Sequence, residues 1–195
     1  SVKIEYSVDE NNWTEDPNTI TATAVADSKT IYVRASVPGV YEGYVKGTQA
    51  LTIEKRPVTA TGEGWDEDQP YTGSEYKKEG WSFGEKEIAE NQTGTITYVI
   101  VGTEVGPYTG TFSNFKVMSG DEEVTDNYAL TENAGKLNIV ESPIAGYVTL
   151  TPANASKIYD GTPLAAAAAT AEDTNGKSVK IEYSVDENNW TEDPN

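Results

Sequence analysis

The 195-residue sequence contains no cysteine, no histidine and a single methionine. Without thiols and imidazoles the chain has no disulfide framework, no structural zinc site and no Cys or Ser-His-Asp nucleophile. Long hydrophobic runs are missing as well. Uncharged apolar stretches such as Thr97–Val101 are far short of the roughly 20 residues that span a bilayer. We therefore expect neither thiol or imidazole chemistry nor membrane insertion.

Basic residues are also scarce, because 14 Lys and Arg stand against 32 Asp and Glu and leave a formal net charge of −18. A chain this acidic repels phosphate backbones and anionic headgroups. Nucleic acid is therefore not an expected partner. With 36% hydrophobic residues the chain can build small cores, and its length exceeds one typical domain of about 100 to 150 residues.

A repeat links the beginning and the end of the sequence. Ser1–Asn18 reads SVKIEYSVDENNWTEDPN, and Ser178–Asn195 repeats these letters without a difference at an offset of 177. Chance does not produce such a match. We interpret the chain as a window from a longer array whose unit is 177 residues long.

A fainter repeat divides this unit. The turn sequence YTGS that starts at Tyr71 returns as YDGT at Tyr159, 88 residues later. The G-x-Y-x-G segment at Gly39–Gly43 likewise echoes Gly106–Gly110, and the strand closed by proline at Leu51–Pro57 echoes Leu137–Pro143. This order predicts two diverged modules per unit, with junctions near Pro57 and Pro143.

The chain then divides into the C-terminal half of one module (1–56), one complete module (57–143) and the N-terminal half of the next (144–195). Acids and bases number 8 and 6 in the first part, 16 and 5 in the second, and 8 and 3 in the third. The net charges are therefore −2, −11 and −5. Because the two half-modules lie on opposite flanks, we expect copies of the chain to associate head to tail.

Strand patterns dominate the sequence. Val2–Val8 alternates apolar and polar residues, and Asp9–Asn12 supplies turn formers before Trp13, which predicts a β-hairpin. Further runs rich in β-branched and aromatic residues are 30–35, 43–45, 50–53, 94–100 and 136–140. The predicted fold class is all-β, with small antiparallel β-sandwich (Ig-like) modules in an elongated tandem array. Helix is limited to a turn or two at Glu85–Asn91, and Ala165–Ala169 carries little weight because a proline precedes it.

Several of these motifs resemble a known family. The sequence KIYDGTPL at Lys157–Leu164 resembles the opening of the YDG and MBG repeat domains of large bacterial cell-surface proteins. The hairpin Ser7–Trp13 and the stretch Asp126–Ile139 are similar to other parts of these repeats. The resemblance implies export and display on the wall of a Gram-positive bacterium, where such modules serve as stalks or as adhesive domains. The middle module departs from this opening and is the better candidate for an acquired activity.

Six residues at turn and strand positions of these repeats are interpreted as structural. They are Trp13, Tyr41, Tyr71, Tyr108, Tyr159 and Gly161.

The densest aromatic segment, Trp65–Phe83, is the leading candidate for a binding surface. Aromatic side chains anchor interfaces and stack on sugar rings. The alternative interpretation is that most of these aromatics fill a small core. The candidate ligand-binding residues are Trp65, Tyr76, Trp81 and Phe83.

Other chemistry is weakly indicated. Acidic clusters at Asp66–Asp68 and Asp121–Asp126 could ligate Ca²⁺. Neither has the spaced D-x-D-x-D-G loop, so the interpretation as solvated charged turns is favoured. No metal or cofactor is predicted. Chance pairs of acids are unavoidable at this composition, and no catalytic residue or enzymatic activity is predicted. An isopeptide bond from Lys46 or Lys116 to Asn127 is a further hypothesis.

The sequence thus favours a repeat segment of a bacterial surface adhesin that binds a host secreted glycoprotein without catalysis. A mucin glycan or an immunoglobulin is the expected ligand, by analogy with surface repeats of gut bacteria. The alternative is a passive structural stalk that projects a binding domain located elsewhere.

Overall fold

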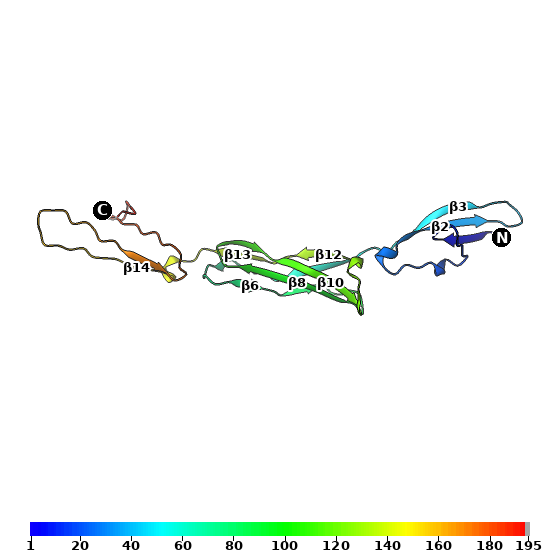
Figure 1. The fold of residues 1–195 in the computed structure, drawn as a ribbon, viewed down its shortest axis with the longest axis horizontal. Helices are drawn as coiled ribbons and strands as arrows, with labels where there is room; N and C mark the ends of the chain where they lie inside the picture. Colours follow the sequence, from blue (N-terminus) through cyan, green and yellow to red (C-terminus); the bar gives the residue numbers. More distant parts are fainter. Residues whose placement is uncertain (194–195) are drawn as a thin grey trace. The chain divides into compact units, whose positions relative to one another are not determined.

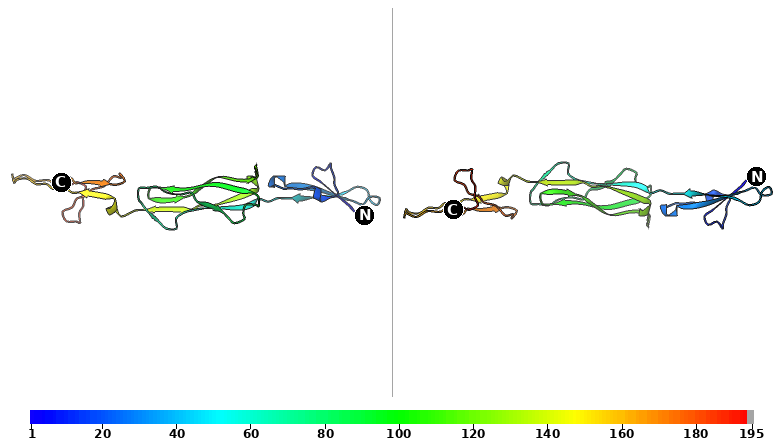
Figure 2. Two further views of the ribbon diagram at one scale, coloured as in Figure 1. Left: turned by 90° about the horizontal axis from the view of Figure 1, so that it is seen from below. Right: turned by 90° about the horizontal axis from the view of Figure 1, so that it is seen from above.

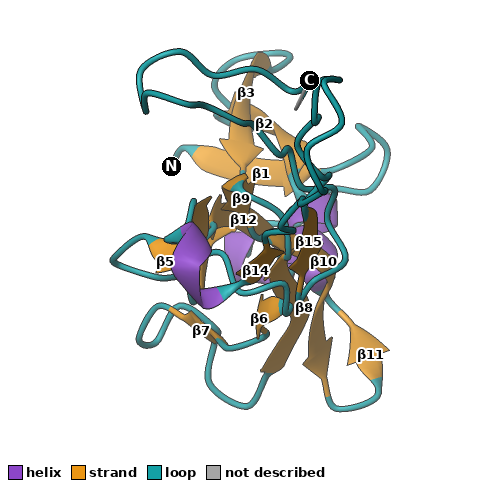
Figure 3. Ribbon diagram, turned by 90° about the vertical axis from the view of Figure 1, so that its left-hand side faces the viewer, coloured by secondary structure: helices purple, strands orange, loops and turns teal. Residues whose placement is uncertain are grey.

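The structure is a computed structural model that describes residues 1–193. Within this range the chain is all-β, without an α-helix, and consists of several small, mostly antiparallel sheets. Figure 3 shows these strands joined by loops and by short helical turns. The helical turns are η1 (Pro17–Thr19), η2 (Val25–Asp27), η3 (Thr125–Asn127) and η4 (Ile144–Gly146).

Two compact units make up the fold. The first consists of Ser1–Asp66, Lys77–Val101 and Tyr108–Leu137, and the second of Glu67–Tyr76, Gly102–Pro107 and the residues from Asn138 onward. Both units contain parts of the middle module predicted from the sequence. The pairing of the named strands follows three separate stretches of the sequence. Strands pair with one another within residues 3–51, within 56–140 and within 148–173.

The first unit begins with a three-stranded antiparallel sheet in the order β1-β2-β3. Its strands are β1 (Lys3–Ser7), β2 (Lys29–Ser36) and β3 (Val45–Leu51). Residues directly opposite each other in such a sheet lie on the same side. Ile4, Ala35 and Val45 are opposite one another and make one side apolar. Glu5 and Arg34 are opposite each other on the other side, which is charged.

The middle strands form three sheets, in the orders β11-β10-β8-β6, β12-β4-β7 and β5-β13-β9. Their bounds are β4 (Arg56–Gly62), β5 (Gln69–Pro70), β6 (Tyr76–Lys78), β7 (Trp81–Phe83), β8 (Thr93–Gly102), β9 (Gly106–Thr109), β10 (Thr111–Ser119), β11 (Glu122–Glu123), β12 (Tyr128–Asn133) and β13 (Lys136–Val140). The long strands β8 and β10 run antiparallel beside each other (Figures 1 and 2).

Tyr98 of β8 is buried in the core of the first unit, with only 2% of its surface exposed. Its hydroxyl donates to the Glu63 carbonyl (2.6 Å) and accepts from the Gly135 amide (3.1 Å), so the buried polar atom is satisfied. A Cβ at Gly62 or Gly110 would come within 2.3 Å of the Tyr98 ring or hydroxyl. Glycine is therefore required at both positions for steric reasons.

Two strand pairs depart from the predicted antiparallel arrangement. β12 pairs with β4 in parallel from Tyr128↔Arg56 to Asn133↔Thr61, and β13 pairs with β5 in parallel. The sequence pattern could not reveal this, because period-two alternation is the same for both directions. Parallel pairing requires a long connection, and the strands between β4 and β12 supply it.

The second unit contains an antiparallel pair of β14 (Val148–Thr151) and β15 (Thr170–Asp173). No regular structure forms at Ala165–Ala169, as expected. Further along, an isolated bridge joins Tyr183 to Thr191. The last two residues of the predicted 144–195 half-module and of the repeat lie outside the described residues.

Most predicted strands are confirmed, and β13 (Lys136–Val140) has the expected bounds. The predicted strands at 43–45 and 50–53 are instead the two ends of one strand, β3. Gly47 in its middle obscured the continuity. Glu85–Asn91 contains turns rather than helix, with Lys86 and Asn91 at positive φ, a conformation that interrupts a right-handed helix.

Candidate functional site

The four predicted ligand-binding aromatics are divided between the two units, with Tyr76 in the second and the other three in the first. All four are half-buried. Trp65 lies beneath Lys78, whose ammonium is 4.6 Å from the centre of the indole ring and also donates to the Gly64 carbonyl. In the second unit, the Tyr76 hydroxyl donates to the Pro70 carbonyl (2.8 Å).

Trp81 and Phe83 lie on the same side of β7, because they are two residues apart in a strand. Their rings meet edge to face with 4.9 Å between centroids, and Phe83 also contacts Phe115 at 5.9 Å. Phe83 packs against the buried cluster that includes Val58 and Val117. The structure therefore places Phe83 against the core of the first unit, with Trp81 beside it.

The residues interpreted as structural have different environments. Trp13, Tyr71 and Tyr108 are half-buried, and Gly161 has a φ of +77°, which suits the turn after Asp160. Tyr41 and Tyr159 lie outside the core, because 74% and 91% of their surfaces are exposed.

A further aromatic arrangement is a stack on the charged side of the β1-β2-β3 sheet. The Arg34 guanidinium lies 4.1 Å from the centre of the Trp13 ring and 4.2 Å from that of Tyr44. Two aromatic faces thus enclose one cation, an arrangement that cation–π attraction stabilises. We call these three residues the Trp13–Arg34–Tyr44 stack.

A buried carboxylate holds the stack in place. Glu5 is 8% exposed, and one of its oxygens accepts from the Arg34 Nε at 2.9 Å. The other oxygen accepts from Lys3 Nζ at 3.0 Å. The hydrogen bond from Arg34, followed by that from Lys3, lowers the pKa of Glu5 below its ordinary value.

The β-hairpin next to the stack orients Trp13. Asp9 accepts hydrogen bonds from the amides of Asn11 (2.9 Å) and Asn12 (2.8 Å), and these bonds hold the pKa of its carboxyl well below the ordinary value, with Asn12 as the leading cause. Glu10 adopts a φ of +58°, and its carbonyl accepts from the Trp13 indole N–H at 3.0 Å. The turn chemistry predicted for Asp9–Asn12 is therefore present.

A shallow hollow of about 310 Å³ borders the stack. It is lined by Glu10, Trp13, Tyr32, Val33, Lys46, Gly47 and Thr48. Aromatic rings beside carboxylate and ammonium groups provide both stacking faces and hydrogen-bonding groups, the combination that binding sites for polar ligands use.

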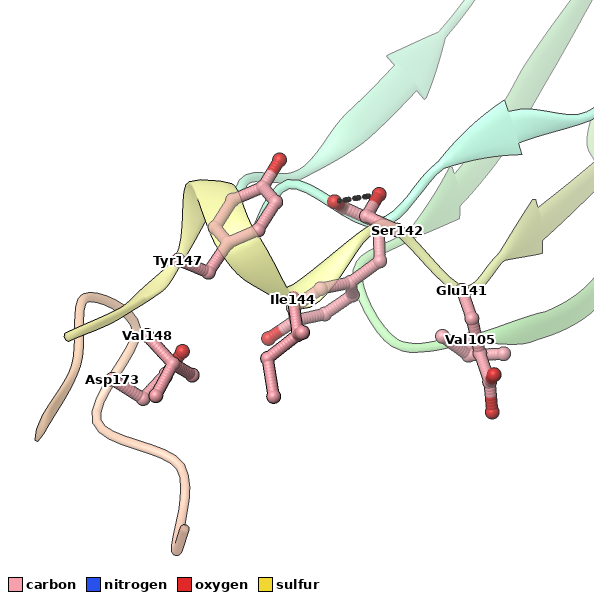
Figure 4. A pocket seen from close by; sticks show the side chains of 8 residues that line it. Val105, Glu141, Ser142, Ile144, Tyr147, Val148 and Asp173 are labelled. Carbon is pink, nitrogen blue, oxygen red and sulfur yellow. Dashed lines mark hydrogen bonds between the residues drawn. The ribbon is translucent and has the colours of Figure 1, made fainter. Parts of the chain in front are cut away.

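A second hollow, of about 280 Å³, lies in the second unit beside the predicted junction at Pro143 (Figure 4). Ile144, Tyr147 and Val148 line it, and the Ser142 hydroxyl at its edge donates to the Tyr71 carbonyl at 2.6 Å. Its lining is largely apolar, and Glu141 and Asp173 are its only acids.

The other chemical candidates have ordinary partners. Between residues 1 and 193, no group of three or more acidic side chains is arranged to hold a metal ion. The Asn127 side chain accepts from the Val25 amide at 2.7 Å, while Lys116 pairs with Glu123 and Lys46 with Glu10. No helical segment in this range is long and apolar enough to cross a bilayer.

Sequence reasoning missed Arg34 and Tyr44. A signal was present, because Arg34 is the only charged residue in the run Ile31–Ala35 and Glu5 is an acid at a polar position of the alternating strand Val2–Val8. A cation and an anion on neighbouring strands suggest a cross-strand pair. The strand register, which the sequence does not specify, was needed to join them.

Comparison of the chain with protein-family models, with curated proteins and with solved structures gives no match.

Proposed function

We propose that the chain is a non-catalytic repeat segment of an exported bacterial surface protein, and that its modules are load-bearing spacers in an array of small Ig-like sandwiches. The likeness of Lys157–Leu164 to YDG and MBG openings supports a location on the cell wall. The acidic, cysteine-free composition also supports it, since exposed thiols are open to oxidation.

The parallel pairing of β4 with β12 carries the spacer proposal. The two strands share six residue pairs, from Tyr128↔Arg56 to Asn133↔Thr61. A pull on the chain before Arg56 and after Asn133 drives parallel strands past each other, so that all their hydrogen bonds are loaded together. In the β14-β15 pair, Val148 is opposite Asp173, and a pull at these ends opens the bonds one after another.

The positions of the predicted binding residues support the same function. Trp65, Trp81 and Phe83 each contact other side chains of the first unit. Side chains that already pack within a module strengthen it and present less surface to a ligand.

Single-molecule stretching of the full chain, tethered at both ends, tests the spacer function. We expect the segment between Arg56 and Asn133 to unfold at a higher force than any other. A Leu130→Pro/Thr131→Pro variant removes donors from β12 and should abolish the high-force step. The control Gln49→Pro, in β3, should leave it unchanged. A segment that opens at the same low force with and without the β12 prolines would contradict the proposal.

Adhesion is a second candidate function, which the Trp13–Arg34–Tyr44 stack and its neighbouring hollow favour. The ligand would be a host secreted glycoprotein, either a mucin glycan or an immunoglobulin, because aromatic faces stack on sugars and anchor protein interfaces. This function places the binding face on residues 1–56 rather than on the Trp65–Phe83 segment.

Biolayer interferometry of the immobilised chain with purified mucin and polyclonal immunoglobulin separates the two functions. Loss of binding in Tyr44→Ala, with binding retained in Trp65→Ala/Trp81→Ala, would establish adhesion through the stack. Binding that is retained in Tyr44→Ala and lost in Trp65→Ala/Trp81→Ala would instead place the binding site on the middle module. If the unmodified chain binds neither partner, adhesion is excluded and the spacer function is the remaining proposal.

A further inference from the structure

Three segments that are far apart in the sequence meet in the second unit. Two of them are loops of the middle module, namely 71–73, which follows β5, and 104–105, which lies between β8 and β9. The third is the turn 173–177 at the end of β15, in the part of the chain beyond Pro143. The chain passes between these two parts through 141–147. A contact among the three segments is therefore a second attachment, in addition to the covalent one.

Local hydrogen bonds shape the 173–177 turn. The Asp173 carboxylate accepts from the backbone amides of Asn175 and Lys177, both at 2.9 Å. The Asp173 carbonyl accepts from the Gly176 amide at 3.0 Å, and Gly176 adopts a φ of +71°, which glycine reaches without steric cost. The turn therefore holds the backbone of Lys177 at a defined position at the end of β15.

Lys177 joins this turn to both loops of the middle module. Its ammonium donates to the two carboxylate oxygens of Glu104, at 2.8 and 3.0 Å, and lies 5.8 Å from the centre of the Tyr71 ring. The hydrogen bond to Glu104 is the leading cause that raises the pKa of Lys177. One side chain thus makes an ion pair with one loop and a cation–π contact with the other.

The loop that receives the turn fits it closely and is itself fastened to the middle module. A Cβ at Gly73 would lie 2.1 Å from the Asn175 Oδ1, so only glycine leaves room for the turn at this point. The Tyr71 amide donates to the Val140 carbonyl at 2.8 Å, and the Tyr71 carbonyl accepts from the Ser142 hydroxyl at 2.6 Å. The loop therefore gives the turn a supported surface.

We propose that Lys177, Glu104 and Tyr71 form a clamp that holds the β14-β15 pair in a fixed orientation to the end of the middle module. We call these three residues the Lys177 clamp. The connection 141–147 is short and keeps the partners of the clamp near each other, so that weak attractions are sufficient to close it. When the clamp is open, the same connection becomes a hinge.

Salt should control the clamp. The side chains of Lys177 and Glu104 are 51% and 63% exposed, and dissolved ions screen an attraction between exposed charges. The joint is therefore expected to be stiff at low salt and flexible at high salt. For a spacer, this would make the reach of the array depend on ionic strength. That consequence rests on the proposed spacer function, whereas the clamp itself does not.

Distances between two spin labels test the clamp in the full chain. Because the chain contains no cysteine, labels attach only at two introduced cysteines, Glu75→Cys and Thr149→Cys, which replace exposed residues on the two sides of the joint. Double electron–electron resonance at low salt should give one narrow distance distribution. Lys177→Gln and Glu104→Gln should each broaden this distribution. About 1 M NaCl should broaden it when the clamp is unmodified.

Two further variants separate the ion pair from a general effect of substitution. Lys177→Glu/Glu104→Lys exchanges the charges, restores their attraction and should make the distribution narrow again. Lys180→Gln is the matched control, because Lys180 is also an exposed lysine but pairs with Glu182 and Glu192. It should leave the distribution unchanged.

Circular dichroism of each variant checks that the sheets remain, and little change is expected because the substituted side chains are exposed. Three results would overturn the proposal. They are a broad distribution for the unmodified clamp at low salt, a narrow distribution that survives both Lys177→Gln and Glu104→Gln, and an exchanged pair that does not narrow the distribution. The stretching experiment depends on the β4-β12 pair instead, so the spacer function and the clamp can fail separately.

Discussion

The chain contains one sequence in two environments, at Ser1–Asp16 and at Ser178–Asp193. The hairpin is the same in both. Asp9 and Asp186 each accept from the two following Asn amides, at 2.8 to 3.0 Å, and the next residues, Glu10 and Glu187, have φ values of +58° and +59°. A structure that persists in two surroundings is determined by interactions between residues close in sequence.

The strand that precedes the hairpin differs between the copies. Lys3–Ser7 forms β1 because β2 pairs with it, whereas its equivalent, 180–184, contains only the bridge at Tyr183. Glu5 is buried beside Arg34 in the first copy, while Glu182 is exposed in the second. A strand needs a partner to satisfy its backbone groups, so its formation depends on the surrounding chain.

Removal of the tryptophan should produce the largest difference between the copies. Trp13→Ala deletes a half-buried ring that holds Arg34 and should destabilise the β1-β2-β3 sheet by about 2 kcal/mol. Replacement of Trp190, which is 56% exposed, by Ala should lower the free energy of unfolding by less than about 0.5 kcal/mol. Hydrogen exchange of β2 amides should accelerate by about 30-fold in the first variant alone. Equal effects would mean that the stack contributes no stability.

Removal of the glutamate should give a smaller, pH-dependent difference. Because the pKa of Glu5 is lowered from 4.5, its ionised form stabilises the fold above that pH, and the contribution is lost as pH falls through the lowered value. Thermal unfolding followed by circular dichroism should show Glu5→Gln to be destabilising at pH 7, with the deficit shrinking below about pH 4.5. Glu182→Gln should have little effect at either pH, since its pair with Lys180 is exposed.

Removal of the aspartate should give no difference between the copies. Asp9→Ala and Asp186→Ala delete the same acceptors, so hydrogen exchange at Asn12 and Asn189 should accelerate equally. The pKa values of both aspartates lie well below 3.8, chiefly because of backbone hydrogen bonds from Asn12 and Asn189 respectively. Both hairpins should therefore persist from pH 7 to about pH 4 and loosen together in stronger acid. Unequal losses would show that the sheet supports the first hairpin.

The middle segment shows where sequence reasoning was sufficient. Alternation in Lys136–Val140 defined a strand with its correct ends, because every second residue is buried there. Aromatic density in Trp65–Phe83 does not specify the direction in which each side chain points. Trp81 contacts Phe83, and Phe83 contacts Phe115, which lies on β10, far along the chain.

By itself, the sequence determined the β-rich character, the turns at Asp9 and Gly161, and the repeat that relates the two flanks. These features depend on alternation, on side chains that bond to nearby backbone, and on the freedom of glycine at positive φ. Only the tertiary structure decided the parallel pairing of β4 with β12 and the contact of Trp13 with Arg34 and Tyr44. These contacts join residues far apart in the chain, and their formation depends on register and direction, which local patterns do not encode.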